Sequence, residues 1–208
     1  MNIHLYLSFI LASAIVLIIP GPTILTVISQ SIHHGRKSAF PLVLGVLLGD
    51  FSAMTLSLLG LGAILQTSAV LFRICKLVGA SYLVYLGLKS CFVKDIQNTP
   101  ENGTEEKKSR SQLFRSTFLV TILNPKSIAF FVAFFPQFVD PAGIAVHQFF
   151  LLGTTFLVLA AVNSALYAVF SGNLGHFMKR DIVKKWFQRI SGGVLIGAGL
   201  MTLAVKEQ

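Results

Sequence analysis

Charged residues are scarce in this chain of 208 residues. Asp, Glu, Lys and Arg make up 12% of it, whereas hydrophobic residues make up 54%. A soluble domain carries about 25% charged residues, and the mean hydropathy here is +0.75. So few charges cannot cover a water-facing surface, so we expect a lipid bilayer around one transmembrane domain that spans residues 1–208.

Cysteines and catalytic motifs are also few. Cys75 and Cys91 fall in one predicted helix and would lie about 24 Å apart, too far for a disulfide. The sequence lacks a GxxxxGK[ST] phosphate loop, an HExxH or GxSxG motif, and any Cys/His set at metal-ligand spacing. These absences argue against ATP hydrolysis by the chain itself and give no support to an enzyme. They predict no metal and no other cofactor.

Six apolar runs are long enough to cross a bilayer, which takes roughly 20 residues. They cover about 5–32, 38–65, 70–93, 116–138, 146–171 and 187–205. Residues 94–113, between the third and fourth runs, are polar, charged and free of aromatics, so we expect a flexible loop there. The pattern predicts an all-α integral membrane protein with six transmembrane helices.

The basic residues predict the orientation. Of the 17 Lys and Arg residues, the first connection holds two, the third six and the fifth five, whereas the opposite side holds three. The positive-inside rule places these basic connections, including the loop at 94–113, in the cytoplasm and both termini outside. The net charge of +9 is thereby accounted for without nucleic acid as a partner.

Six spans with an outside N-terminus divide into three plus three of opposite direction. "PGPT" at 20–23 in the first run corresponds to "NPKS" at 124–127 in the fourth, and "KLVGASYLVYLGL" resembles "RISGGVLIGAGL" in the sixth. Interrupted helices at matching positions of an inverted repeat are typical of transporters whose site lies at the bilayer midplane. We predict a 3+3 inverted-topology repeat with helices one and four interrupted.

The proline breaks expose backbone groups inside the membrane. Pro20 and Pro22 lack N–H groups and free the carbonyls of Val16 and Ile18 from helical pairing. Gly21 suits the N-cap of a restarted helix. The freed carbonyls predict a cation site, whereas a plain kink is the structural alternative for either break alone.

The fourth run repeats this pattern. Asn124 suits the N-cap and Pro125 the first helical position. Each restart directs N–H groups and a partial positive charge into the membrane interior, which predicts a site for a carboxylate or phosphate.

Two ionisable residues lie at mid-depth, Asp50 in the second run and Lys126 in the fourth. Buried charges are costly and mark a function or a pair. They form a structural ion pair, or they line a path in which Lys126 meets a carboxylate and Asp50 meets an ammonium or a proton. A buried carboxyl favours its protonated form, which suits proton coupling at Asp50. Asn163, at mid-depth in the fifth run, is a further candidate.

Glycines recur four residues apart in two places. The pair at 45 and 49 directly precedes Asp50, and a second pair stands at 193 and 197. Such pairs favour close helix packing. They also permit a homodimer.

Two blocks of this sequence carry a family resemblance. "PGPTILTVISQSIHHGRKSAFPLVLGVLLGD" and "NPKSIAFFVAFFPQFVDP" resemble the two signatures of the lysine exporter and homoserine–threonine resistance (LysE/RhtB) family. The resemblance implies export of amino acids or derivatives across the bacterial inner membrane, driven by the ion gradient. The family's conserved blocks map onto Pro20, Gly21, Pro22, Gly35, Arg36, Gly45, Gly49, Asp50, Asn124, Pro125, Lys126, Pro136 and Gln137.

The combined interpretation is a secondary transporter that works by alternating access. The substrate carboxylate is expected at the two helix restarts near Lys126, and its ammonium at Asp50 and the freed carbonyls. The fifth run has no acidic residue, which favours neutral over basic amino acids. A basic amino-acid exporter, an uncoupled solute channel and a non-transport scaffold are the alternatives. The predicted substrate site comprises Pro20, Gly21, Pro22, Thr23, Asp50, Asn124, Pro125, Lys126 and Asn163.

Overall fold

The computed structural model describes most of the chain. The described residues are 2–67, 69–92, 108–140, 142–171, 186, 189–190, 192–193, 195–197, 199–200 and 202. The elements are α1 (Ile3–Ile18), α2 (Pro22–His34), η1 (Arg36–Ser38), α3 (Ala39–Thr67), α4 (Ala69–Phe92), α5 (Arg110–Ile122), α6 (Pro125–Ala129), η2 (Phe130–Phe134), η3 (Phe135–Phe138) and α7 (Ala145–Val169). Within the described ranges every regular element is a helix, which confirms the all-α prediction.

Two helices are long and apolar enough to cross a membrane, 36–62 and α7. Two bent pairs each reach this length together: α1 with α2, bent by 52°, and α5 with the helix at 125–138, bent by 41°. The breaks fall where the sequence predicts interrupted helices. The helix α4 matches the third predicted run, and the described residues of the sixth run are helical.

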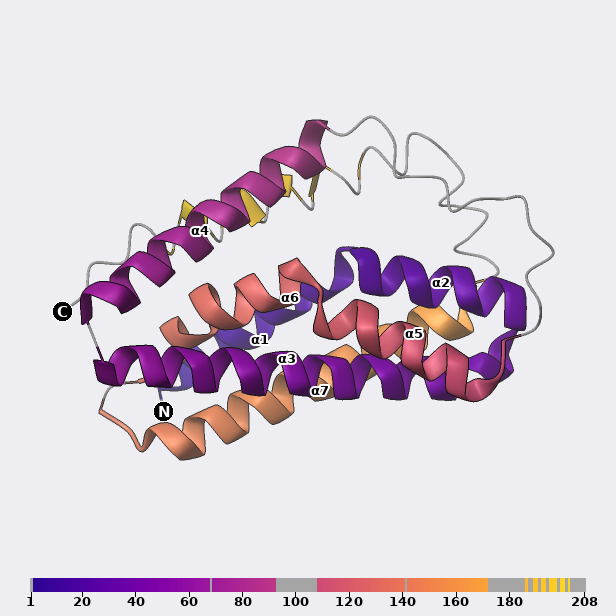
Figure 1. The fold of residues 1–208 in the computed structure, drawn as a ribbon, viewed down its shortest axis with the longest axis horizontal. Coiled ribbons are helices and arrows are strands. Elements are labelled where there is room, and N and C mark those ends of the chain that lie inside the picture. The colour runs from indigo at the N-terminus through magenta and orange to yellow at the C-terminus, as the bar shows by residue number, and fades with distance from the viewer. Residues whose placement is uncertain are drawn as a thin grey trace.

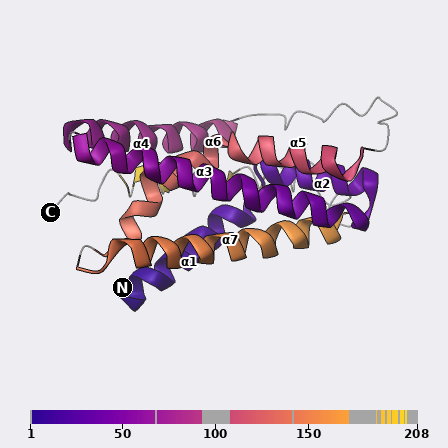
Figure 2. The same ribbon diagram turned by 60° about the horizontal axis from the view of Figure 1, so that its bottom comes forward.

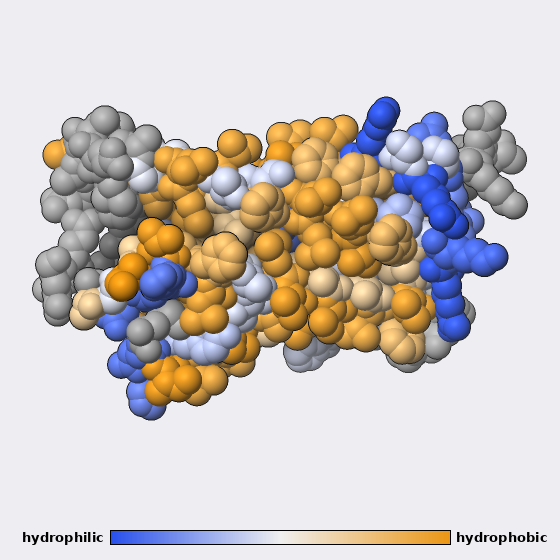
Figure 3. Space-filling model, turned by 90° about the horizontal axis from the view of Figure 1, so that it is seen from below, coloured by the Kyte–Doolittle hydropathy of each residue, from blue (hydrophilic) through white to orange (hydrophobic). Residues whose placement is uncertain are grey.

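The helices form an elongated bundle whose surface is banded. At one end of the bundle the end of α2, the start of α3 and the start of α5 come together (Figure 1). Figure 2 shows α1 crossing beside α7. A wide apolar band lies between hydrophilic ends (Figure 3). Large apolar side chains such as Leu56, Leu123 and Phe150 are exposed. This banding is that of a protein set in a bilayer.

The helix α5 begins inside the segment expected to be a loop. Ser109 caps it in a capping box with Gln112, in which each side chain accepts a hydrogen bond from the other's backbone N–H. The expected loop at 94–113 is therefore wrong for its last four residues, which are helical from Arg110. Residues 94–107 lie outside the described residues.

The two similar segments of the third and sixth runs pack against each other. A methyl group on Gly87 would lie 2.6 Å from the carbonyl oxygen of Gly192, and one on Gly199 would lie 2.7 Å from that of Ala80. The contacts move down one segment as they move up the other, so the helices are antiparallel. Their glycines are what let the backbones approach so closely.

Of the three buried apolar clusters among the described residues, two lie next to the helix breaks. The aromatic cluster lies toward the N-terminal ends of α1 and α7 and comprises Phe9, Val16, Ala53, Met54, Phe130, Phe131, Phe134, Phe135, Phe138, Leu152, Phe156 and Ala160. The aliphatic cluster lies toward the opposite end and comprises Val27, Leu42, Val46, Leu113 and Ala168.

Candidate functional site

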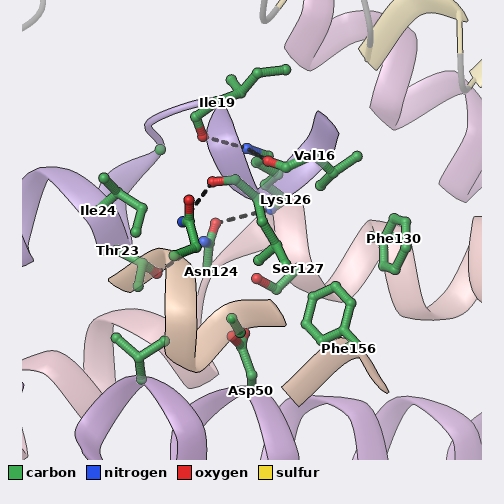
Figure 4. A pocket seen from close by; sticks show the side chains of 15 residues that line it. Val16, Ile19, Thr23, Ile24, Asp50, Asn124, Lys126, Ser127, Phe130 and Phe156 are labelled. Atoms are coloured by element: carbon green, nitrogen blue, oxygen red, sulfur yellow. Dashed lines mark hydrogen bonds between the residues drawn. The ribbon is translucent and has the colours of Figure 1, made fainter. Parts of the chain in front are cut away.

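The two broken helices meet where they restart. α2 begins at Pro22 and α6 at Pro125, each behind the N-cap residue that the sequence predicts. The Asn124 side chain accepts a hydrogen bond from the backbone N–H of Lys126 at 3.1 Å and donates one to the Thr23 hydroxyl at 3.0 Å. One asparagine therefore caps its own helix and ties it to the first turn of α2 (Figure 4).

The broken end of α1 is capped by Lys126. Its Nζ donates to the carbonyl oxygens of Val16 at 2.6 Å and Ile19 at 2.8 Å (Figure 4). Its stem passes Gly21, where a Cβ atom would lie 3.5 Å from Lys126 Cδ. A helix C-terminus carries partial negative charge and stabilises a cation. The sequence predicted a cation site at the freed carbonyls, and in this structure the cation is the protein's own ammonium.

Two residues of α7 satisfy the carbonyls in between. Asn163 Nδ2 donates to the carbonyl oxygen of Leu17 at 2.9 Å, and the Tyr167 hydroxyl donates to that of Ile18 at 2.7 Å. Together with Lys126, these side chains from the C-terminal half of the chain satisfy the four consecutive backbone carbonyls of residues 16–19. This arrangement meets the requirement that no backbone polar group be left unpaired in lipid.

Asp50 of α3 presents an unpaired acceptor to the same region. The residue is 3% exposed, and its Oδ1 has no hydrogen-bond partner. The Ser127 hydroxyl points toward its carboxyl group (Figure 4). Both Asp50 and Lys126 are described, and no salt bridge joins them, since the ammonium is bound to backbone carbonyls. Of the two alternatives for these charges, the structural ion pair does not describe this conformation.

Glycine packing holds Asp50 in this position. A methyl group on Gly49 would lie 2.6 Å from Thr121 Cβ, and one on Gly45 would lie 2.8 Å from the carbonyl oxygen of Phe114. The predicted close packing is thus directed at α5. The same packing uses this glycine pair within the chain, whereas a Cβ added at Gly193 or Gly197 would meet nothing within 4 Å among the described residues.

A small cavity lies between these groups. Its volume is about 40 Å³, which is room for a few water molecules and less than an amino acid occupies. Six predicted site residues line it: Gly21, Thr23, Asp50, Asn124, Lys126 and Asn163. The prolines at 20, 22 and 125 are not part of the lining; they shape the backbone around it.

The cavity separates the two apolar clusters. Phe130 and Phe156 of the aromatic cluster and Val46 of the aliphatic cluster all contribute to its lining. Asp50 and Lys126 are its only charged lining residues within the described part of the chain. Across that same part, no group of three or more His, Cys, Asp or Glu side chains is placed to hold a metal ion.

A comparison with known protein families covers nearly the whole chain, including the residues around the cavity. The model of the LysE type translocator family matches residues 14–206. The chain belongs to the LysE type translocator family.

Relatives of this LysE type translocator are bacterial membrane proteins. It is 29% identical to an uncharacterized membrane protein of Vibrio cholerae, over 99% of this chain and 100% of the relative. It is 32% identical to a leucine efflux protein of Salmonella typhimurium, over 97% of this chain and 93% of the relative. It is 31% identical to a leucine efflux protein of Enterobacter, over 90% of this chain and 88% of the relative. No solved structure matches it significantly.

Sequence reasoning did not assign every residue of this translocator's site. Tyr167 was missed, although it follows Asn163 by one helical turn in an otherwise apolar run, a spacing that places both on one face. Phe130 and Phe156 were missed because an apolar residue at helical spacing carries no mark that separates a cavity wall from ordinary core.

Proposed function

We propose that this chain is a secondary transporter that exports neutral amino acids across the bacterial plasma membrane. The observation that carries the proposal is the charge pattern of the cavity. A half-buried lysine and a buried aspartate line it without forming a salt bridge with each other. An amino-acid zwitterion carries the complementary pair of charges, and a site with zero net charge matches a substrate with zero net charge.

Each charged end of the substrate then has a partner. The Lys126 ammonium has three donors and uses two on the α1 carbonyls, so the third is directed to the substrate carboxylate. The start of α2 adds its partial positive charge. The substrate ammonium binds the free Oδ1 of Asp50. This assignment departs from the expected binding of that ammonium to the freed carbonyls, which hold Lys126, Asn163 and Tyr167 instead.

The names of two relatives and the chemistry of the cavity lining support a neutral substrate. Two of the relatives described above are named leucine efflux proteins. A substrate with a cationic side chain would need a second acid, and within the described lining Asp50 stands alone.

The proposal includes the predicted architecture. Six transmembrane helices form a 3+3 inverted repeat in a single domain, the connection between the third and fourth helices lies in the cytoplasm, and both termini lie outside. Two observations support it: the two bent helix pairs break at matching points, and the echoed segments pack antiparallel.

Transport requires the cavity to open and close. Because it holds less than an amino acid, we propose alternating access in which one apolar cluster separates while the other stays packed. Asp50 would take up a proton from outside when the substrate leaves, and release it inside. This exchange couples export to the proton gradient.

Export of labelled amino acids from dipeptide-loaded cells tests the proposal. Cells that carry the gene should export a neutral amino acid faster than cells without it, at a rate that saturates. Asp50→Asn should slow export and remove its dependence on external pH.

Other outcomes contradict separate parts of the proposal. Export of lysine or arginine alone would identify a basic exporter. A rate that never saturates and ignores the proton gradient would identify a channel. Normal export with normal pH dependence in Asp50→Asn would exclude the coupling role of that residue.

A further inference from the structure

The cavity has a polar side and an apolar side. In Figure 4, Thr23 and Asn124 lie on one side, and the rings of Phe130 and Phe156 lie on the other, beyond Ser127. The apolar lining on the ring side consists of Val16, Phe130, Phe156 and Ala160. All four are members of the aromatic cluster and are at most 7% exposed.

The two rings form a fixed wall. Phe130 and Phe156 stack with their centroids 5.4 Å apart, and Phe156 also meets the ring of Phe131 edge-on at 5.0 Å. Phe130 is the first residue of the π-helical segment η2, and Phe156 lies in the middle of α7. Packing on both faces leaves these rings little freedom to rotate away from the cavity.

Ala160 sets the depth of this wall. It follows Phe156 by one helical turn on α7 and is 1% exposed. Its methyl group is the smallest side chain of the apolar lining, so a larger residue here would fill cavity space rather than protrude into lipid.

The polar groups nearest the wall direct hydrogen-bond donors away from it. The Asn163 amide donates to Leu17, and the Ser127 hydroxyl points to Asp50 rather than to the rings. The rings and aliphatic side chains of the wall offer a substrate hydroxyl no hydrogen-bond partner, so the hydroxyl would lose its water without a replacement.

We propose that Val16, Phe130, Phe156 and Ala160 form the side-chain subsite of this transporter, and that it selects large aliphatic side chains of the leucine type over hydroxylated ones of the threonine type. The inference rests on the proposed function, because the zwitterion bound at Lys126 and Asp50 is what directs the side chain to the wall. An apolar pocket discriminates against an added hydroxyl by up to about 100-fold, and by about 10-fold or more for each methylene that fits or fails to fit.

Export ratios test this subsite. Cells loaded with dipeptides release leucine, threonine and alanine together, and ratios of their export rates do not depend on the amount of transporter. The wild type should favour leucine over threonine. Ala160→Leu should lower the leucine-to-alanine ratio about 10-fold, since the new side chain occupies the space of the substrate's. The matched control is Val162→Phe, which adds bulk on the lipid-facing side of the same helix, where Val162 is 54% exposed, and should leave the ratio unchanged.

A second variant keeps the test decisive if Ala160→Leu fails to fold. If Ala160→Leu is absent from the membrane, Ala160→Gly enlarges the same site by one methyl group and should raise the leucine-to-alanine ratio. Unchanged ratios in the variants that reach the membrane, or a wild type that favours threonine, would overturn the subsite while leaving amino-acid export intact. A wild type that exports no amino acid would instead overturn the proposed function.

Discussion

Lys126 shows how a charged residue is tolerated inside a membrane bundle. Its ammonium lies against the C-terminal carbonyls of α1, where two hydrogen bonds and the helix dipole offset its lost hydration. The proline break supplies those carbonyls, because Pro20 has no N–H to donate to Val16. The break and the lysine are therefore one feature built from two distant parts of the chain.

Lys126→Met should destabilise the protein and abolish export. The methionine fills a similar volume but leaves the carbonyls of Val16 and Ile19 without donors, at a cost of about 1–3 kcal/mol for each buried group. Thermal unfolding of the purified protein in detergent measures the loss. The control is Lys37→Met, which removes an exposed cation at the end of the bundle. Equal melting temperatures for the two variants would show that the α1 carbonyls do not depend on Lys126.

At the scale of elements, the contact of α3 with α5 places the acid. Glycines at 45 and 49 let α3 lie directly on the backbone of α5, and Asp50 follows at the edge of that contact. Asp50 therefore faces the start of α6 because the glycines that precede it on α3 pack against α5. Larger residues in place of the two glycines would push α3 away from α5 and move Asp50 away from the cavity.

Gly49→Ala should destabilise the protein by about 1–3 kcal/mol, because its methyl group would overlap the buried side chain of Thr121. Gly60→Ala is the matched control. It lies on the same helix with nothing within 4 Å of the added Cβ, and the better helix propensity of alanine should stabilise the protein by up to about 1 kcal/mol. Denaturant unfolding in mixed micelles measures both. If Gly49→Ala is as stable as Gly60→Ala, the helices separate easily and Asp50 is not held by this contact.

At the scale of the whole molecule, the cavity lies between two barriers of different size. Among the residues that the structure describes, the aromatic cluster has twelve buried members and the aliphatic cluster five. The end beyond the aliphatic cluster carries the basic turn at Arg36 and Lys37, joined to the chain before α5 by a hydrogen bond of 2.9 Å from the Lys108 backbone to His34. The positive-inside rule predicts that this is the cytoplasmic end, so we expect the substrate to enter past the aliphatic cluster.

Thiol labelling tests that orientation. In a protein whose Cys75 and Cys91 are replaced by Ser, Lys37→Cys should resist a membrane-impermeant thiol reagent in intact cells and react after lysis. Ala142→Cys, an exposed position at the other end of the bundle, should react in intact cells. The reverse pattern would place the N-terminus inside and contradict the predicted topology.

Much of the fold was predictable because its signals are local. A proline disrupts helical pairing whatever surrounds it, so the breaks at 20–22 and 124–125 could be located from the sequence. The loop boundary at 113 was wrong because composition outweighed the capping signal at Ser109 and Gln112. Of the site, the charged and amide residues could be named, whereas the ring wall could not.

The sequence by itself determined the membrane class, the positions of both helix breaks and the residues that carry charge at mid-depth, since each depends on composition or on the chemistry of one residue. Only the tertiary structure decided which groups meet. Lys126, Asn163 and Tyr167 are more than 100 residues from the carbonyls they satisfy, and no local pattern links them. Their pairing results from the packing of α1 against α7 and from the Lys126 side chain that reaches α1 from α6, and it leaves Asp50 beside the cavity with a free acceptor.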